Sequence, residues 1–175
     1  GDLKVMEEEI KTSLNQEVEK RVKADLKKQV FEVLVESHEM DIPKSLITME
    51  VNRMMQSTHD NLKKQGADSK EIKLERSMFE ETAIKTCKLR IVLASLVDAN
   101  KLEASDEQIK AKVNEFSANF DDTEKAEKWF YDDPKRLDEP TALSTEDNIV
   151  EWFLKECKIE NKKISFDELM LMQAS

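Results

Sequence analysis

The chain has 175 residues, of which 39% are hydrophobic and 38% are charged, and its formal net charge is −10. This acidic balance argues against nucleic acid or an anionic membrane as the main partner, because both attract clustered positive charge. No run of about twenty apolar residues predicts a membrane span, and the high charged fraction fits long helices with a large solvent-exposed area.

Residues that break helices are scarce throughout the chain. Glycine occurs only at positions 1 and 66, and proline only at positions 43, 134 and 140. Glu, Lys, Leu, Ala and Met dominate, and β-branched alternation is nearly absent. We therefore predict an almost entirely helical chain.

A first helix is expected from about residue 3 to about residue 37, with an apolar residue at every fourth position. This row comprises Met6, Ile10, Leu14, Val18, Val22, Leu26, Val30 and Leu34. Because an α-helix has about 3.6 residues per turn, such a row drifts by about 40° at each step. No single neighbouring helix can cover it from end to end. We expect an exposed, projecting N-terminal half and a better-buried C-terminal half.

A second helix is expected to begin at Pro43, a residue that suits the first helical turn, and to end at Gly66 as its C-cap. Its apolar face comprises Ile47, Val51, Met54, Met55 and Leu62, whereas Leu46 and Met49 lie off that face. Methionine is flexible and is over-used on surfaces that bind many partners. We expect the apolar face to pack and the residues beside it to remain available for binding.

A third helix is expected from about residue 74 to about residue 98. Its apolar residues lie all around the helix axis: Ile84, Cys87, Leu89, Ile91, Val92, Leu93, Leu96 and Val97. A helix that is hydrophobic on every side is normally buried. We predict that this helix forms the centre of the core.

The next helix is expected to open at a capping box formed by Ser105 and Gln108. Its apolar stripe comprises Ile109, Val113, Phe116 and Phe120. A further helix is expected from about Asp122 to the aromatic cluster at residues 129–131. Residues 132–147, with Pro134 and Pro140, read as an acidic connector to a last long helix near residues 148–159. Ser165 and Glu168 predict a second capping box.

The two cysteines, Cys87 and Cys157, are too few for a disulfide framework and too far apart in sequence for a zinc site. Both lie in apolar helical runs, which predicts two buried free thiols. Free thiols fit a reducing compartment, so we expect a cytosolic protein.

No catalytic, nucleotide or metal site is predicted, and we expect no cofactor and no enzymatic activity. A single internal glycine leaves no loop that could cradle a phosphate. His38 and His59 fit neither a His-Glu-x-x-His zinc motif nor a helical di-metal carboxylate site.

Two apolar groups are candidates for a binding surface. The first is Phe116, Phe120, Trp129 and Phe130, and the second contains Met49, Met54 and Met55. Core packing is the alternative for both groups and, for the aromatic group taken alone, the favoured one. However, several amphipathic helices are joined by polar connectors, and only one helix is apolar enough to centre a globule. We therefore expect some apolar faces to stay exposed, and large exposed patches mark binding sites.

Four segments together resemble the C-terminal domain of bacterial trigger factor, a ribosome-associated folding chaperone. They are FEVLVESHEMDIPKSLITMEVNRMM, FEETAIKTCKLRIVLASLVDANKLEASDEQI, VNEFSANFDDTEKAEKWFY and NIVEWFLKECKIENKKISFDELM. The likeness covers essentially the whole chain. It implies an all-α, elongated, multi-helix domain with a long N-terminal helix, a buried central helix and projecting helical arms, formed by residues 1–175. The ribosome-docking and prolyl isomerase domains of the family are expected to be absent from this chain.

The resemblance also implies a passive, ATP-independent chaperone of the bacterial cytoplasm. It would cradle unfolded or nascent polypeptides on scattered apolar patches, and would reach the ribosome only through the family's N-terminal domain. The residues that it implies for client binding are Phe116, Phe120, Trp129, Phe130, Met49, Met54, Met55, Met78 and Phe79, with Leu137 and Leu143 as weaker candidates. We expect no direct contact with nucleic acid or membrane, and a weak homodimer is possible.

Two alternatives remain open. One shares the fold: a periplasmic chaperone module of the SurA type. The other is a helical scaffold or dimerisation module, which would bind one defined partner and bury its aromatic residues completely.

Overall fold

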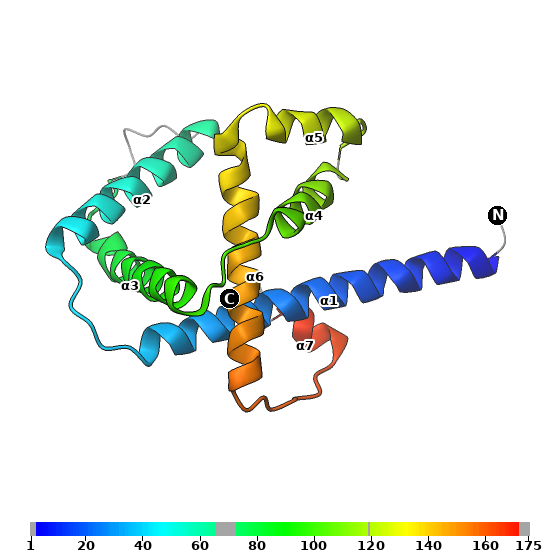
Figure 1. Cartoon of the computed structure of the whole chain (residues 1–175), viewed down its shortest axis with the longest axis horizontal. Helices are drawn as coiled ribbons and strands as arrows, with labels where there is room; N and C mark the ends of the chain where they lie inside the picture. Colours follow the sequence, from blue (N-terminus) through cyan, green and yellow to red (C-terminus); the bar gives the residue numbers. More distant parts are fainter. Residues whose placement is uncertain (1–2, 66–72, 119, 172–175) are drawn as a thin grey trace. The chain divides into compact units, whose positions relative to one another are not determined.

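The structure is a computed structural model that describes residues 3–65, 73–118 and 120–171. Its helices are α1 Leu3–Glu36, α2 Lys44–Lys64, α3 Ser77–Asn100, α4 Asp106–Ser117, α5 Thr123–Tyr131, α6 Asp138–Glu156 and α7 Phe166–Leu171, with a 3₁₀ turn η1 at Pro134–Leu137 (Figure 1). No β-strand occurs in these ranges, so the prediction of an all-α, multi-helix chain is confirmed. Within the same ranges, no helix combines the length and the apolar character needed to cross a membrane.

Contacts between residues divide the chain into two compact units. One unit consists of Gly1–Glu32 with Ala104–Ser175, and the other consists of Val33–Glu103. The expectation that residues 1–175 act as one domain stays a prediction.

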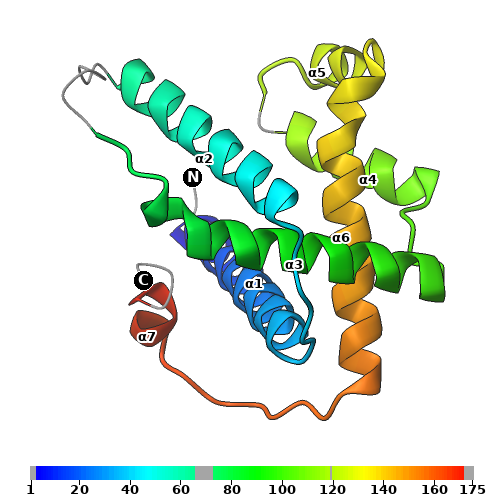
Figure 2. The ribbon, with the colours of Figure 1, turned by 90° about the vertical axis from the view of Figure 1, so that its left-hand side faces the viewer.

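The unit Val33–Glu103 is built on α2 packed against α3, and Figure 2 shows the two helices side by side. Val51 of α2 and Ala83 and Cys87 of α3 are buried, and the Cys87 thiol donates a hydrogen bond to the carbonyl oxygen of Leu46 at 3.7 Å. The predicted division of α2 is confirmed: its apolar face is buried or half-buried, whereas Leu46 and Met49 are exposed. Pro43 precedes the first helical residue, and the expected cap Gly66 lies outside the described residues.

The predicted burial of α3 on every side is wrong in part. Ala83, Cys87 and Val92 are buried, but Ile84 and Ile91 are exposed. Packing on α2 covers only part of the helix surface, and Ile84 and Ile91, which lie seven residues apart on one side of the helix, remain open to solvent. In α3, apolar residues on every side of the helix therefore indicate an exposed apolar side and not complete burial.

The long helix α1 differs between its two halves, as predicted. Met6, Ile10 and Leu14 are exposed, whereas Val30 and Leu34 are buried. The drift of a four-residue repeat explains this contrast, because the row leaves the covered side of the helix within a few turns.

Charged side chains tie α1 and α4 to α6 within the unit Gly1–Glu32 with Ala104–Ser175. Asp147 of α6 lies 3.3 Å from Lys23 of α1 and 3.3 Å from Lys112 of α4, and Lys27 of α1 pairs with Glu146. Burial raises the pKa of Asp147, but the two lysine ammonium groups outweigh this effect and hold the pKa below its usual value. The carboxylate therefore stays charged and holds the middle of α4, through Lys112, against α6.

Both predicted capping boxes are present. The Ser105 hydroxyl accepts a hydrogen bond from the Gln108 backbone N–H, and the Gln108 side chain accepts one from the Ser105 N–H. Ser165 and Glu168 repeat this arrangement at the start of α7. Each pair satisfies backbone donors that the first turn of a helix leaves free.

The predicted acidic connector at residues 132–147 is wrong. The 3₁₀ turn η1 and the start of α6 occupy this segment, so α6 begins at Asp138. Pro140 lies in the first turn of α6, where backbone N–H groups have no partner within the helix, and its missing N–H therefore costs no hydrogen bond.

Two further expectations also fail. Cys157 is exposed rather than buried, because it follows the last residue of α6. Phe120 lies beyond the end of α4, in the turn before α5, although its backbone N–H still donates to the carbonyl oxygen of Ser117 at 3.0 Å.

Candidate functional site

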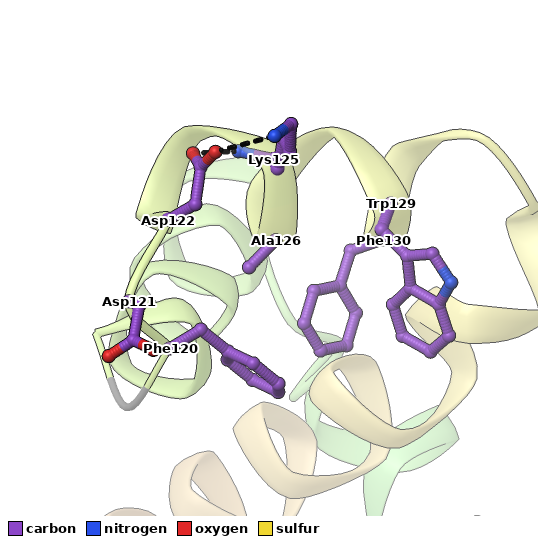
Figure 3. Close-up of a pocket in the computed structure, with 7 residues that line it drawn as sticks. All are labelled: Phe120, Asp121, Asp122, Lys125, Ala126, Trp129 and Phe130. Carbon is purple, nitrogen blue, oxygen red and sulfur yellow. Dashed lines mark hydrogen bonds and ion pairs between the residues drawn. The ribbon is translucent and has the colours of Figure 1, made fainter.

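A pocket of about 470 Å³ lies where α4 ends and α5 runs back beside it. We call it the aromatic pocket. It is lined by Phe120, Asp121, Asp122, Lys125, Ala126, Trp129 and Phe130 (Figure 3).

The chain reverses direction tightly at the mouth of this pocket. Asp122 caps α5 by accepting a hydrogen bond from the Lys125 backbone N–H at 3.1 Å, and it pairs with the Lys125 ammonium at 3.0 Å. Lys125 lowers the pKa of Asp122, so the cap stays ionised in neutral solution. From this cap, the helix places Ala126 and Phe130, four residues apart, on one face.

The floor of the aromatic pocket is packed. Phe130 is buried, and its ring centroid lies 6.0 Å from that of Phe116 of α4. The Trp129 indole meets the Phe130 ring edge to face, with centroids 5.2 Å apart. Aromatic pairs favour such offset and edge-to-face arrangements. The floor therefore joins α4 to α5.

The walls of the pocket face solvent. Phe120 is 59% exposed and Trp129 is 53% exposed. Figure 3 shows the rings of Phe120, Phe130 and Trp129 turned to one side of the pocket, while the Asp121 carboxylate points away from them. The aromatic pocket therefore exposes to solvent an apolar surface with charged residues at its rim.

A second pocket, of about 410 Å³, lies between α2 and α3 in the other unit. We call it the methionine pocket. It is lined by Arg53, Met54, Ser57, Thr58, Met78, Phe79 and Thr82. Met78 is 68% exposed, so this pocket also offers an apolar side chain to solvent.

A buried carboxylate lies beside the methionine pocket. Glu50 of α2 is only 3% exposed and accepts hydrogen bonds from Arg53 Nε at 3.1 Å and from Arg90 of α3 at 3.3 Å. The hydrogen bond from Arg53 lowers the pKa of Glu50, burial opposes it, and the charges of Arg53 and Arg90 lower it further. Arg53 is thereby fixed at the edge of the pocket.

The predicted client-binding residues divide into three sets. Phe130 forms the floor of the aromatic pocket and Phe120 and Trp129 form its walls, whereas Phe116 does not line the pocket but packs against Phe130. Met54, Met78 and Phe79 line the methionine pocket. Met49 is exposed, and Met55, Leu137 and Leu143 are half-buried; these four line neither pocket.

Several lining residues were not predicted from the sequence. Ala126 precedes Phe130 by one helical turn, a spacing that could have identified it. Ser57 and Thr58 lack such a signal, because only the packing of α2 on α3 brings them beside Met78. A third cavity, of about 860 Å³, lies between α1 and residues 159–169 and was not predicted from the sequence. It is lined by Val22, Leu26, Ile159, Ile164, Leu169 and six polar residues.

The pockets contain no arrangement that would hold a metal ion. Across residues 3–65, 73–118 and 120–171, no group of three or more His, Cys, Asp or Glu side chains comes together as a metal site would require. The chemistry available at the pockets is apolar contact with charged groups at the rim.

Comparison with known proteins finds one family. Residues 2–155 match the model of the bacterial trigger factor protein C-terminus. The chain is 46% identical over 170 residues to the trigger factor of Methylobacillus flagellatus, with 97% of this chain and 39% of that protein aligned. It is 38% identical to the trigger factors of Laribacter hongkongensis, over 171 residues, and Herminiimonas arsenicoxydans, over 170 residues, again with 97% of this chain aligned. The chain thus spans about 39% of the length of these relatives.

Proposed function

This chain belongs to the trigger factor family, as the resemblance predicted, and from that premise we propose that it binds unfolded or nascent polypeptides on its exposed apolar pockets and keeps them from aggregating. The observation that supports this most is the pair Phe120 and Trp129, both more than half exposed at the mouth of one pocket. A scaffold that used these residues in its own core would bury them, whereas exposed apolar side chains that gather in one patch, as these two do in the pocket, are characteristic of binding sites.

The two pockets suit a passive mechanism. Each offers a few apolar side chains, so each binds a client segment weakly. When one unfolded chain occupies several such sites, the first contact raises the effective concentration of the next segment, and the weak contacts add. The client leaves when folding buries its own apolar residues, and no nucleotide is consumed.

The wider setting belongs to the same proposal. The chain would work in the bacterial cytoplasm, and other parts of a full-length trigger factor would dock on the ribosome and carry prolyl isomerase activity. The net charge of −10 would help to keep a complex with an aggregation-prone client in solution. The weak homodimer stays a prediction, which sedimentation at several protein concentrations would test.

Aggregation of a denatured protein tests the proposal. A guanidinium-denatured model enzyme is diluted into buffer with increasing amounts of this chain, and light scattering is followed. We expect scattering to fall as the chain approaches excess. The double variant Phe120→Ala/Trp129→Ala should protect much less, because it removes the two exposed walls and leaves the packed floor in place.

Tyr131→Ala provides a matched control. Tyr131 lies on the same helix and is about as exposed as Trp129, but it does not line the aromatic pocket. This variant should protect like the unaltered chain. No protection by the unaltered chain in excess would refute the chaperone function, and equal loss in both variants would refute its assignment to the pocket.

A further inference from the structure

The exposed indole of Trp129 is held in place by Arg136. The Arg136 guanidinium carbon lies 4.2 Å from the centroid of the Trp129 ring, well within the roughly 6 Å range of a cation–π contact. Arg136 Nη1 also donates a hydrogen bond to the Trp129 carbonyl oxygen at 2.6 Å. The Arg136 side chain therefore contacts both the backbone and the ring of Trp129.

The turn between α5 and α6 creates this contact. The Asp133 side chain accepts a hydrogen bond from the Lys135 backbone N–H at 3.0 Å, and Pro134 begins η1. This turn carries Arg136 back to the last turn of α5, where carbonyl groups have no partner within the helix. A cation at that end also interacts favourably with the helix dipole.

No competing carboxylate holds the guanidinium. Within the described ranges, Arg136 makes no ion pair with an acidic side chain, although five aspartates occur at residues 121, 122, 132, 133 and 138. Its side chain is half-buried. The contacts with Trp129 are thus the ones that fix its position.

We propose that Arg136 is a positioning residue that fixes the Trp129 indole as a wall of the aromatic pocket. This inference rests on the proposed function, because the wall matters only if the pocket binds a client. An unrestrained exposed indole would sample several rotamers and would lose that freedom on binding. Fixing it beforehand reduces the entropic cost of association.

Variants at Arg136 test the proposal in the full chain. The chain has two tryptophans, so the Trp152→Phe background leaves Trp129 as the only indole. Arg136→Met keeps most of the stem and removes the cation, and Arg136→Lys keeps the charge but loses the planar group. Lys135→Met is the matched control, because it makes the same charge change one residue away on an exposed side chain.

Two readouts are compared. The first is the steady-state fluorescence anisotropy of Trp129 together with its quenching by acrylamide. The second is the affinity for fluorescein-labelled, reduced and carboxymethylated α-lactalbumin, a permanently unfolded probe. Arg136→Met should lower the anisotropy, increase the quenching and weaken binding about two- to fivefold, the size expected for one exposed cation–π contact. Arg136→Lys should lie between it and the unaltered chain, and Lys135→Met should change neither readout.

Unchanged anisotropy in Arg136→Met would overturn the proposal, and so would an equal loss of affinity in Lys135→Met, which would indicate a general charge effect. If circular dichroism shows that Arg136→Met has lost helix, the comparison of Arg136→Lys with the unaltered chain decides by the same two readouts. Failure of the proposed function looks different: the unaltered chain would then not bind the probe, or Phe120→Ala/Trp129→Ala would bind it equally well, while the anisotropy would still report whether Arg136 orders the indole.

Discussion

The aromatic pocket and the methionine pocket offer apolar surface in two physically different ways. In the aromatic pocket, the floor is the Phe130 ring, which packs against Phe116, and the Trp129 indole lies against both Phe130 and the Arg136 guanidinium. In the methionine pocket, flexible Met54 and Met78 lie beside polar groups, and Arg53, which also lines the pocket, binds the buried carboxylate of Glu50. Aromatic side chains lose little conformational entropy on binding, whereas methionine adapts its shape to the partner. On the function proposed above, we infer that the aromatic pocket supplies more of the affinity for a client, and that the methionine pocket accepts a wider range of client sequences.

Truncating the floor of the aromatic pocket is the strongest way to probe this contrast. Phe130→Ala should lower the free energy of unfolding by about 3 kcal/mol, because it leaves a cavity between α4 and α5. Met54→Ala, at a half-buried position of the methionine pocket, should cost only about 1 kcal/mol. Urea unfolding followed by circular dichroism measures both. Equal losses would show that the two pockets do not differ in how their bases are packed.

The methionine pocket should instead be sensitive to acid. The pKa of Glu50 is held below its ordinary value of 4.5, so its ion pairs contribute fully above pH 4.5 and are lost as the pH falls through the lowered value. Glu50→Gln should lower the free energy of unfolding at pH 7 by about 1–2 kcal/mol, a modest amount because both arginine side chains are largely exposed.

The difference between Glu50→Gln and the unaltered chain should also shrink between pH 7 and pH 3. Denaturation at both pH values checks this, with Glu81→Gln as the control, since Glu81 is an exposed partner of Lys85 on the surface of α3. A constant difference at the two pH values would mean that the charge of Glu50 does not support the packing of α2 on α3.

A smaller effect is expected from the helix caps. Ser105→Ala removes the cap of α4, the helix that carries Phe116, and should cost about 1 kcal/mol. Ser165→Ala makes the same change at α7, away from the aromatic pocket. Amide hydrogen exchange should therefore speed up in α4 only for the first variant. If Ser105→Ala leaves the rate of amide hydrogen exchange in α4 unchanged, the cap does not stabilise the helix that supports the pocket.

Local sequence patterns predicted much of the fold. The row from Met6 to Leu34 predicted a helix with differently buried halves, and Ser105 with Gln108 predicted where α4 begins. The incorrect predictions concern residues whose burial or conformation depends on their position within a helix. The prediction of a connector at Pro140 overlooks that the first turn of a helix accepts proline, and the prediction of burial on every side of α3 overlooks the side that carries Ile84 and Ile91, which stays exposed.

The candidate site was predictable in its residue types but not in its geometry. The aromatic spacing identified Phe120 and Trp129 as candidates, but the sequence could not separate them from Phe116 and Phe130. Phe116 and Phe120 belong to one apolar stripe in the sequence, and Trp129 and Phe130 are neighbours on α5. Arg136 gave no signal, since the 3₁₀ turn that brings it onto Trp129 lies in a segment taken for a connector.

The most direct test of the central claim is a binding titration that compares the two pockets. Fluorescein-labelled, reduced and carboxymethylated α-lactalbumin is titrated with the unaltered chain, Phe120→Ala/Trp129→Ala, Met54→Ala/Met78→Ala and Tyr131→Ala, and fluorescence anisotropy gives the dissociation constants. We predict an about tenfold weaker complex for the aromatic double variant, equivalent to about 1.4 kcal/mol, about threefold for the methionine double variant, and no change for Tyr131→Ala. Unchanged binding by both double variants, with their helix content intact, would contradict the account.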